Sequence, residues 1–114
     1  VQSENCAPFM ETVRQNAEHI VSVDVKPTLA EGIAIGKPAR GAEVLEMIRK
    51  HSIRVVTAPE AQILECRRQM AAKGFYVEHT TAAALAAYYR YQELYGPTHD
   101  ALISLCGAGL KSEH

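Results

Sequence analysis

Two short polar segments of the sequence carry residue types that could bind a ligand. Glu78-His79-Thr80-Thr81 follows the apolar run Phe75–Val77, and Cys106-Gly107-Ala108-Gly109 follows the apolar run Ala101–Leu105. If both runs are strands of a parallel sheet, their carboxyl ends lie at the edge where open α/β sheets bind ligands. The sequence therefore predicts that a carboxylate, two hydroxyls and a thiol surround one candidate site.

Each segment also has a simpler interpretation. Thr80 or Thr81 can cap the following helix through its hydroxyl, and Glu78 can lie near the positive end of that helix. Gly107 and Gly109 can belong to an ordinary turn, although they would also let the backbone approach a flat ligand closely. From these residues alone, a capping cluster and a ligand site are both open.

The cysteines and histidines show no metal-binding spacing. Cys6, Cys66 and Cys106 form no CxxC pair, so neither a zinc site nor a thioredoxin-like motif is expected. We interpret Cys6 and Cys66 as small buried hydrophobic residues and the setting as reduced and cytoplasmic. The histidines form no HxxxH or HxH motif, and no metal is expected at them.

Length and charge limit the class of protein. The chain has 114 residues and a net charge of −1 with neutral histidines. These values predict a single domain over residues 1–114 and give no electrostatic reason to expect nucleic acid or an anionic membrane as partner. Hydrophobic residues make up 47% of the sequence and charged residues 22%, as in globular proteins. No apolar run approaches the length of a membrane span.

Helical and extended patterns alternate along the chain and predict the elements that would position the two polar segments. Helices are expected from Pro8 onward and at Ala42–His51, Glu60–Lys73 and about Thr81–Tyr95. Strands are expected at Ile53–Thr57, Phe75–Val77 and Ala101–Leu105, and a strand or an extended segment at Ile20–Val25. This alternation predicts right-handed βαβ units, and so an α/β fold of three layers with a mostly parallel sheet flanked by helices.

Several segments in a fixed order resemble the fold-type II pyridoxal-phosphate enzymes. This group includes threonine synthase, threonine and serine dehydratases, serine racemase and the tryptophan synthase β chain. TLAEGIA is most similar to the dehydratases and GAGLK to threonine synthase, and the resemblance covers nearly the whole chain. The segments that carry it are Thr28–Ala34, Lys37-Pro38, Val55–Thr57, Tyr76–Glu78, Thr81–Ala86 and Cys106–Lys111.

The resemblance implies that this chain is the C-terminal part of the catalytic domain of a pyridoxal-phosphate lyase. The glycine-rich phosphate loop and the lysine that forms the Schiff base would lie before Val1, and none of the five lysines stands in a matching context. The chain alone would then be inactive, because this chemistry needs that amine. The intact enzyme would act on a small amino acid by elimination or replacement, as threonine synthase and threonine or serine dehydratase do.

The same resemblance assigns cofactor contacts. Cys106 takes the place of the Ser, Thr or Cys that hydrogen-bonds the pyridine nitrogen, and the two glycines after it would let the backbone pass the ring. His79 replaces a family proline beside the pocket. Gln2 and Pro8 stand where serine racemase-like members hold a divalent cation with carboxylates, so no metal is expected there. The residues expected to contact or border the cofactor are Cys106, Gly107, Gly109, Glu78, Thr80 and Thr81.

Two other functions are consistent with the sequence. The chain could be a stand-alone, non-enzymatic α/β module that binds a ligand or a partner. It could also be a structural fragment that forms a homodimer through exposed apolar surface. Tyr88, Tyr91 and Tyr95 follow helical spacing, and tyrosine is favoured both in packing faces and at interfaces.

Overall fold

A computed structural model describes residues 1–111 and shows four α-helices and two short strands in that range. The helices lie close to where the sequence predicts them. None of these helices is long and apolar enough to cross a membrane. The elements are β1 (Gln2–Ser3), α1 (Pro8–Arg14), η1 (Glu31–Ile33, a single 3-10 turn), α2 (Gly41–Lys50), β2 (Thr57–Ala58), α3 (Glu60–Ala72), α4 (His79–Tyr95) and η2 (Gly109–Lys111).

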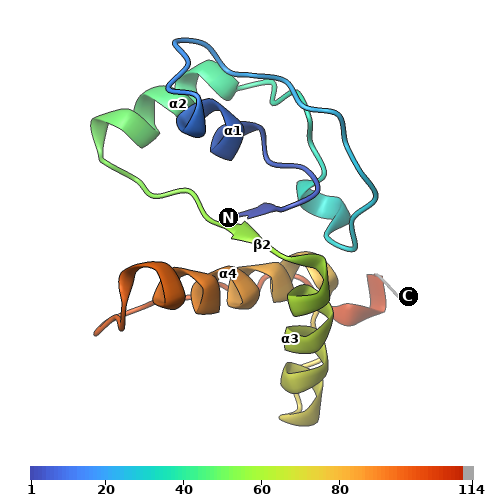
Figure 1. The fold of residues 1–114 in the computed structure, drawn as a ribbon. Coiled ribbons are helices and arrows are strands. Elements are labelled where there is room, and N and C mark those ends of the chain that lie inside the picture. The colour runs from blue at the N-terminus through green and yellow to red at the C-terminus, as the bar shows by residue number, and fades with distance from the viewer. Residues whose placement is uncertain (112–114) are drawn as a thin grey trace.

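The strands β1 and β2 pair in parallel, with Gln2 opposite Thr57 and Ser3 opposite Ala58. This pairing confirms the α/β class. Helix α4 packs against both strands and against α3, while α1 and α2 lie in the other part of the molecule (Figure 1). Within residues 1–111 two strands are too few to define layers, so the three-layer arrangement stays a prediction.

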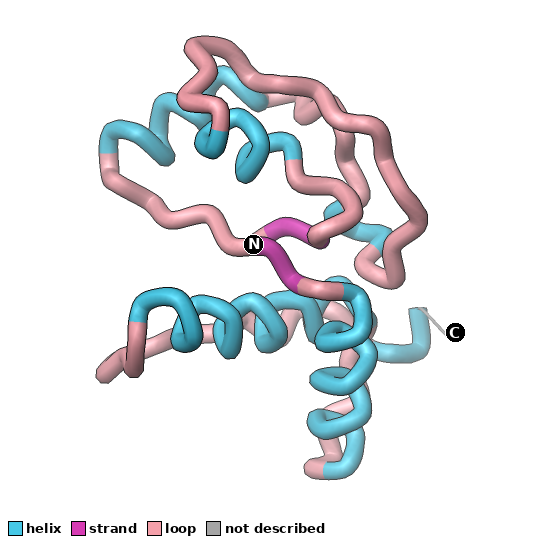
Figure 2. The backbone as a smooth tube through the Cα atoms, in the orientation of Figure 1, coloured by secondary structure: helices cyan, strands magenta, loops and turns pink. Residues whose placement is uncertain are grey.

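Two strand predictions are wrong or nearly so, and a third run takes its extended alternative. Ala101–Leu105 lies in a loop that follows α4 (Figure 2). Leu102 within it is 98% exposed. Ile20–Val25 is the extended alternative and forms no ladder. Phe75–Val77 contributes only an isolated antiparallel bridge from Val77. A strand needs a neighbouring strand for its backbone groups, and no element of residues 1–111 pairs with these runs in a ladder.

The core lies where α3 crosses α4 beside the strands. The small alanine side chains on α4 let larger side chains of α3, such as Ile63 and Met70, pack close to its backbone. The radius of gyration is 14.3 Å, compared with about 13 Å typical of a chain this long. The buried cluster consists of Ala30, Val56, Ala58, Ile63, Cys66, Met70, Val77, Ala82, Ala83, Ala86 and Ala87.

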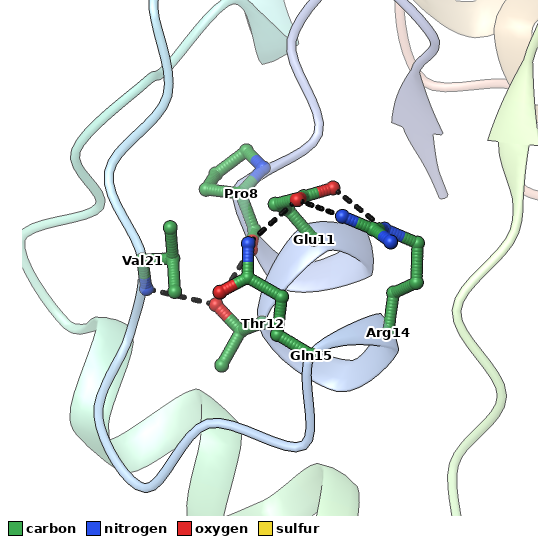
Figure 3. A network of polar contacts seen from close by, with 6 residues as sticks. All are labelled: Pro8, Glu11, Thr12, Arg14, Gln15 and Val21. Atoms are coloured by element: carbon green, nitrogen blue, oxygen red, sulfur yellow. Dashed lines mark hydrogen bonds and ion pairs between the residues drawn. The ribbon is translucent and has the colours of Figure 1, made fainter.

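The loop after α1 is tied back to that helix by the buried Thr12. Its Oγ1 donates to the Pro8 carbonyl at 2.7 Å and accepts from the Val21 amide at 2.9 Å (Figure 3). Leaving a buried amide without an acceptor destabilises a fold by about 1–3 kcal/mol. The Thr12 hydroxyl therefore holds the loop at Val21 against α1. On the solvent side, the hydrogen bond from Arg14 lowers the pKa of the Glu11 carboxyl to about 2, but an exposed pair of this kind adds little stability.

Candidate functional site

The segment Cys106–Gly109 docks on the first turn of α4. The Gly107 N–H donates to Thr81 Oγ1 at 3.0 Å, and the Gly107 carbonyl accepts from the same hydroxyl at 3.2 Å. That carbonyl also accepts from the Glu78 amide at 3.0 Å. Thr81 and Gly107 are both buried. The structure therefore brings together three of the predicted site residues, Glu78, Thr81 and Gly107.

Close contact with protein side chains favours glycine at two positions of this segment. A Cβ on Gly107 would lie 1.6 Å from Glu78 Oε1, and a Cβ on Gly109 would lie 2.7 Å from the Tyr76 ring. The Gly109 N–H also donates to the Tyr76 carbonyl at 2.9 Å. Packing within the chain is thus enough to explain both glycines, and their contact with a cofactor stays a prediction.

Thr80 faces a different segment from Thr81. Its Oγ1 accepts a hydrogen bond from the N–H of Gly32, the middle residue of η1, at 3.0 Å. The expected capping role of Thr80 and Thr81 is wrong, because α4 begins at His79 and Glu78 stands at its cap without a side-chain hydrogen bond. The two hydroxyls are instead used to bind backbone from distant parts of the chain.

Cys106 is exposed, whereas Cys6 and Cys66 are buried as the sequence predicts. Burial raises the pKa of the Cys6 and Cys66 thiols, which fits inert core residues. The exposed Cys106 thiol is accessible to a ligand, and its backbone precedes Gly107, which Thr81 holds in place. Cys106 is therefore the thiol of this chain that could take part in binding.

Arg67 on α3 supports the segment that leads into α4, a role that sequence reasoning missed. Its Nε donates to the Val77 carbonyl at 2.9 Å, and its guanidinium carbon lies 5.0 Å from the centre of the Tyr76 ring. Gly109 packs on the same ring, so Arg67 supports the Tyr76 side chain against which the Cys106–Gly109 segment lies. The helical pattern of α3 alone gives no signal for a partner ten residues later.

A second polar cluster that sequence reasoning missed lies where β1 and β2 end. Glu60, the first residue of α3, accepts hydrogen bonds from the Ser3 and Thr28 hydroxyls and from the Leu29 amide. An acidic residue directly after Pro59 at a helix start is a recognisable signal for the positive helix end. Its partners lie 31 to 57 residues away in the sequence, so the pattern could not identify them.

Two grooves of about 700 Å³ lie against α2 rather than at the start of α4, and one of them is lined by apolar residues that include Phe9, Val44 and Met47. Among residues 1–111, no group of three or more His, Cys, Asp or Glu is arranged to hold a metal ion.

Comparison with known proteins gives a match over most of the chain. The family model described as pyridoxal-phosphate dependent enzyme matches residues 1–107, a range that includes the first turn of α4, Cys106 and Gly107. A search of curated proteins finds no match. The side chains at the site fit the ring end of this cofactor, because a thiol or hydroxyl can donate a hydrogen bond to a pyridine nitrogen and the Cys106 thiol is exposed.

We predict that Gly107→Ala lowers the free energy of unfolding by about 1–3 kcal/mol, the usual cost of overpacking. The reason is the 1.6 Å approach of the new methyl group to Glu78 Oε1. Denaturation in urea would measure the change. The control is the same substitution in a Glu78→Ala chain, which lacks the carboxylate. There Gly107→Ala should lower the free energy of unfolding by less. An equal cost in both backgrounds would contradict this contact.

Proposed function

Because the chain belongs to the family of pyridoxal-phosphate dependent enzymes, we propose that its candidate site is one wall of a pyridoxal 5′-phosphate site. The observation that carries the proposal is the docking of Cys106–Gly109 on the first turn of α4, which lies almost wholly within the matched range. The substrate is a small amino acid, the class on which enzymes with this cofactor act. The exposure of Cys106 supports the view that further polypeptide encloses the ligand.

The chain's own residues hold and orient the ring. Cys106 would donate a hydrogen bond from its thiol to the pyridine nitrogen, while the bonds of Gly107 with Thr81 and of Gly109 with the Tyr76 carbonyl keep the backbone of that segment in position. Glu78 and Thr80 border the pocket on the side of α4. When bound, the cofactor supplies an electron sink for reactions at the α carbon of an amino acid. A thiol donor makes the ring a weaker sink than a carboxylate would, which suits elimination or replacement.

The reaction that we propose for the intact enzyme is that of a lyase of the threonine synthase or threonine/serine dehydratase type, in a cytoplasmic setting. The resemblance of Thr28–Ala34 to the dehydratases and of Gly107–Lys111 to threonine synthase supports this class. We propose that the chain is the C-terminal part of the catalytic domain and that its strand pair belongs to a three-layer, mostly parallel sheet. None of its five lysines forms the covalent bond to the cofactor, so the chain by itself is not catalytic.

We predict that the chain binds pyridoxine 5′-phosphate, which has no aldehyde, and that Cys106→Ala weakens this binding about 2- to 10-fold, as expected for one lost hydrogen bond. Cys106→Ser keeps a donor and should bind within about twofold of the unchanged chain. Isothermal titration calorimetry measures the affinity of the unchanged chain and of each variant. Equal affinity of the alanine and serine variants would contradict the role of Cys106.

The same titration with pyridoxal 5′-phosphate, followed by borohydride reduction and mass spectrometry, tests the lysines. We expect no lysine to be labelled more than in the chain unfolded in urea. Selective labelling of one lysine would contradict the proposed absence of catalysis. Failure of both compounds to bind would favour the alternative, a non-enzymatic module that binds another ligand or a partner.

The apolar loop Ala101–Leu105 supports a homodimer, which we propose as the state of this chain. Leu102 is 98% exposed and Leu105 48%, and exposed apolar surface of this kind marks association sites. We predict a dimer in sedimentation velocity at micromolar concentration, weakened by Leu102→Glu but not by the control Ile35→Glu, which also replaces an exposed apolar residue. A strict monomer at all concentrations would contradict the dimer.

A further inference from the structure

The carboxylate of Glu60 is the common acceptor of three groups from two distant segments. Its Oε1 accepts from Ser3 Oγ at 2.7 Å and from Thr28 Oγ1, and its Oε2 accepts from the Leu29 amide at 2.8 Å. Ser3 ends β1, and Thr28 and Leu29 precede η1. Glu60 therefore joins the end of the strand pair to the start of the segment 28–33.

Three donors point at the Glu60 carboxylate: the hydroxyls of Ser3 and Thr28 and the amide of Leu29. The Ala30 amide donates to Thr28 Oγ1 at 3.1 Å, and the Asn5 amide donates to Ser3 Oγ at 3.1 Å. Each hydroxyl accepts a hydrogen bond from a backbone amide and lies within hydrogen-bonding distance of Glu60 as a donor, and the Thr28 hydroxyl also lies 2.9 Å from Ser3 Oγ. An ionised carboxylate only accepts, so it suits three donors, whereas a protonated carboxyl would present a donor of its own.

The surroundings keep Glu60 ionised. Burial acts to raise the pKa of the Glu60 carboxyl, but the hydrogen bonds from Thr28, Leu29 and Ser3 together with the electrostatic effect of His79 outweigh it and lower the pKa below its ordinary value. The other charged group that faces this end of α3 is Glu4, whose Oε1 accepts from the Glu60 amide at 3.0 Å.

The far end of the same segment reaches the candidate site. Ala30 is fully buried in the core beside α4, and the Gly32 amide donates to Thr80 Oγ1 at 3.0 Å. Thr80 follows Glu78 and His79 in the first turn of α4, next to the docking point of Gly107. The segment 28–33 thus spans from Glu60 to the edge of the proposed cofactor site.

We propose that Glu60 is a positioning residue that clamps the segment 28–33 against Thr80 and so sets one border of the cofactor site. The inference rests on the proposed function for the identity of the ligand, but the clamp is a property of the free chain. It acts without touching the ligand, because its hydrogen bonds go to Ser3, Thr28 and Leu29.

Amide hydrogen exchange, followed by NMR on the chain, tests the clamp. In Glu60→Ala, the Leu29 and Gly32 amides should exchange about 10- to 100-fold faster, as expected for the loss of hydrogen bonds to a charged acceptor. The matched control is Glu65→Ala on the same helix, whose carboxylate forms an exposed ion pair with Arg68. Faster exchange at Leu29 alone, with Gly32 unchanged, would overturn the positioning role.

The pH dependence distinguishes a charged clamp from ordinary packing. Since the pKa of Glu60 is lowered in the folded chain, its stabilising effect is complete above the ordinary pKa of about 4.3. The effect is lost as the pH falls through the lower, folded value. The Leu29 amide shift should follow this transition in the unchanged chain but not in Glu60→Gln, which cannot titrate. A transition that persists in Glu60→Gln would overturn the inference.

Two Thr28 variants cover the case in which Glu60 variants do not fold. Thr28→Val removes the hydroxyl and should speed exchange at Gly32, whereas Thr28→Ser keeps the hydroxyl and should restore protection. Protection of α3 and α4 amides reports that each variant is folded. If valine and serine give equal exchange at Gly32, the clamp is overturned. If the clamp holds but the unchanged chain fails to bind pyridoxine 5′-phosphate, the failure lies with the proposed function.

Discussion

The docking of Gly107 on the first turn of α4 is the contact on which the candidate site depends. One hydroxyl, that of Thr81, both donates to and accepts from the Gly107 backbone, and the Glu78 amide adds a third hydrogen bond. The approach is so close that any side chain on Gly107 would displace the Glu78 side chain. Without this contact, Cys106 would have no fixed position relative to α4.

Segments far apart in the sequence are held around this contact by different kinds of interaction. Small side chains on α4 allow α3 to pack closely, and this packing places Arg67 behind the Tyr76 ring and Glu60 near the end of the strands. The carboxylate of Glu60 then holds the segment that reaches Thr80. Apolar packing thus sets the overall arrangement, and hydrogen bonds to buried or half-buried polar groups set the local geometry.

Helices were predictable from this sequence because their signals are local. Pro59 and Gly74 flank α3, and Gly96, which has a positive φ of 87°, ends α4. The strands were harder to predict, because a strand needs a neighbouring strand that no local pattern reveals. The apolar run Ala101–Leu105 has the composition of a covered strand but no partner among the described residues. The site was predictable in part: Glu78, Thr81 and Gly107 meet as expected, but Thr80 binds Gly32 instead of capping its helix. Glu60 and Arg67 depend on partners that no local pattern reveals.

The central claim, that the surface formed by α4 and the Cys106–Gly109 segment receives the pyridine ring, is most directly tested by NMR mapping. Pyridoxine 5′-phosphate would be added to the isotope-labelled chain while backbone amide shifts are followed. We expect saturable shifts that cluster at Thr80, Cys106 and Gly107. Shifts that cluster instead in the apolar groove at Val44 and Met47, or no saturable shifts, would contradict it.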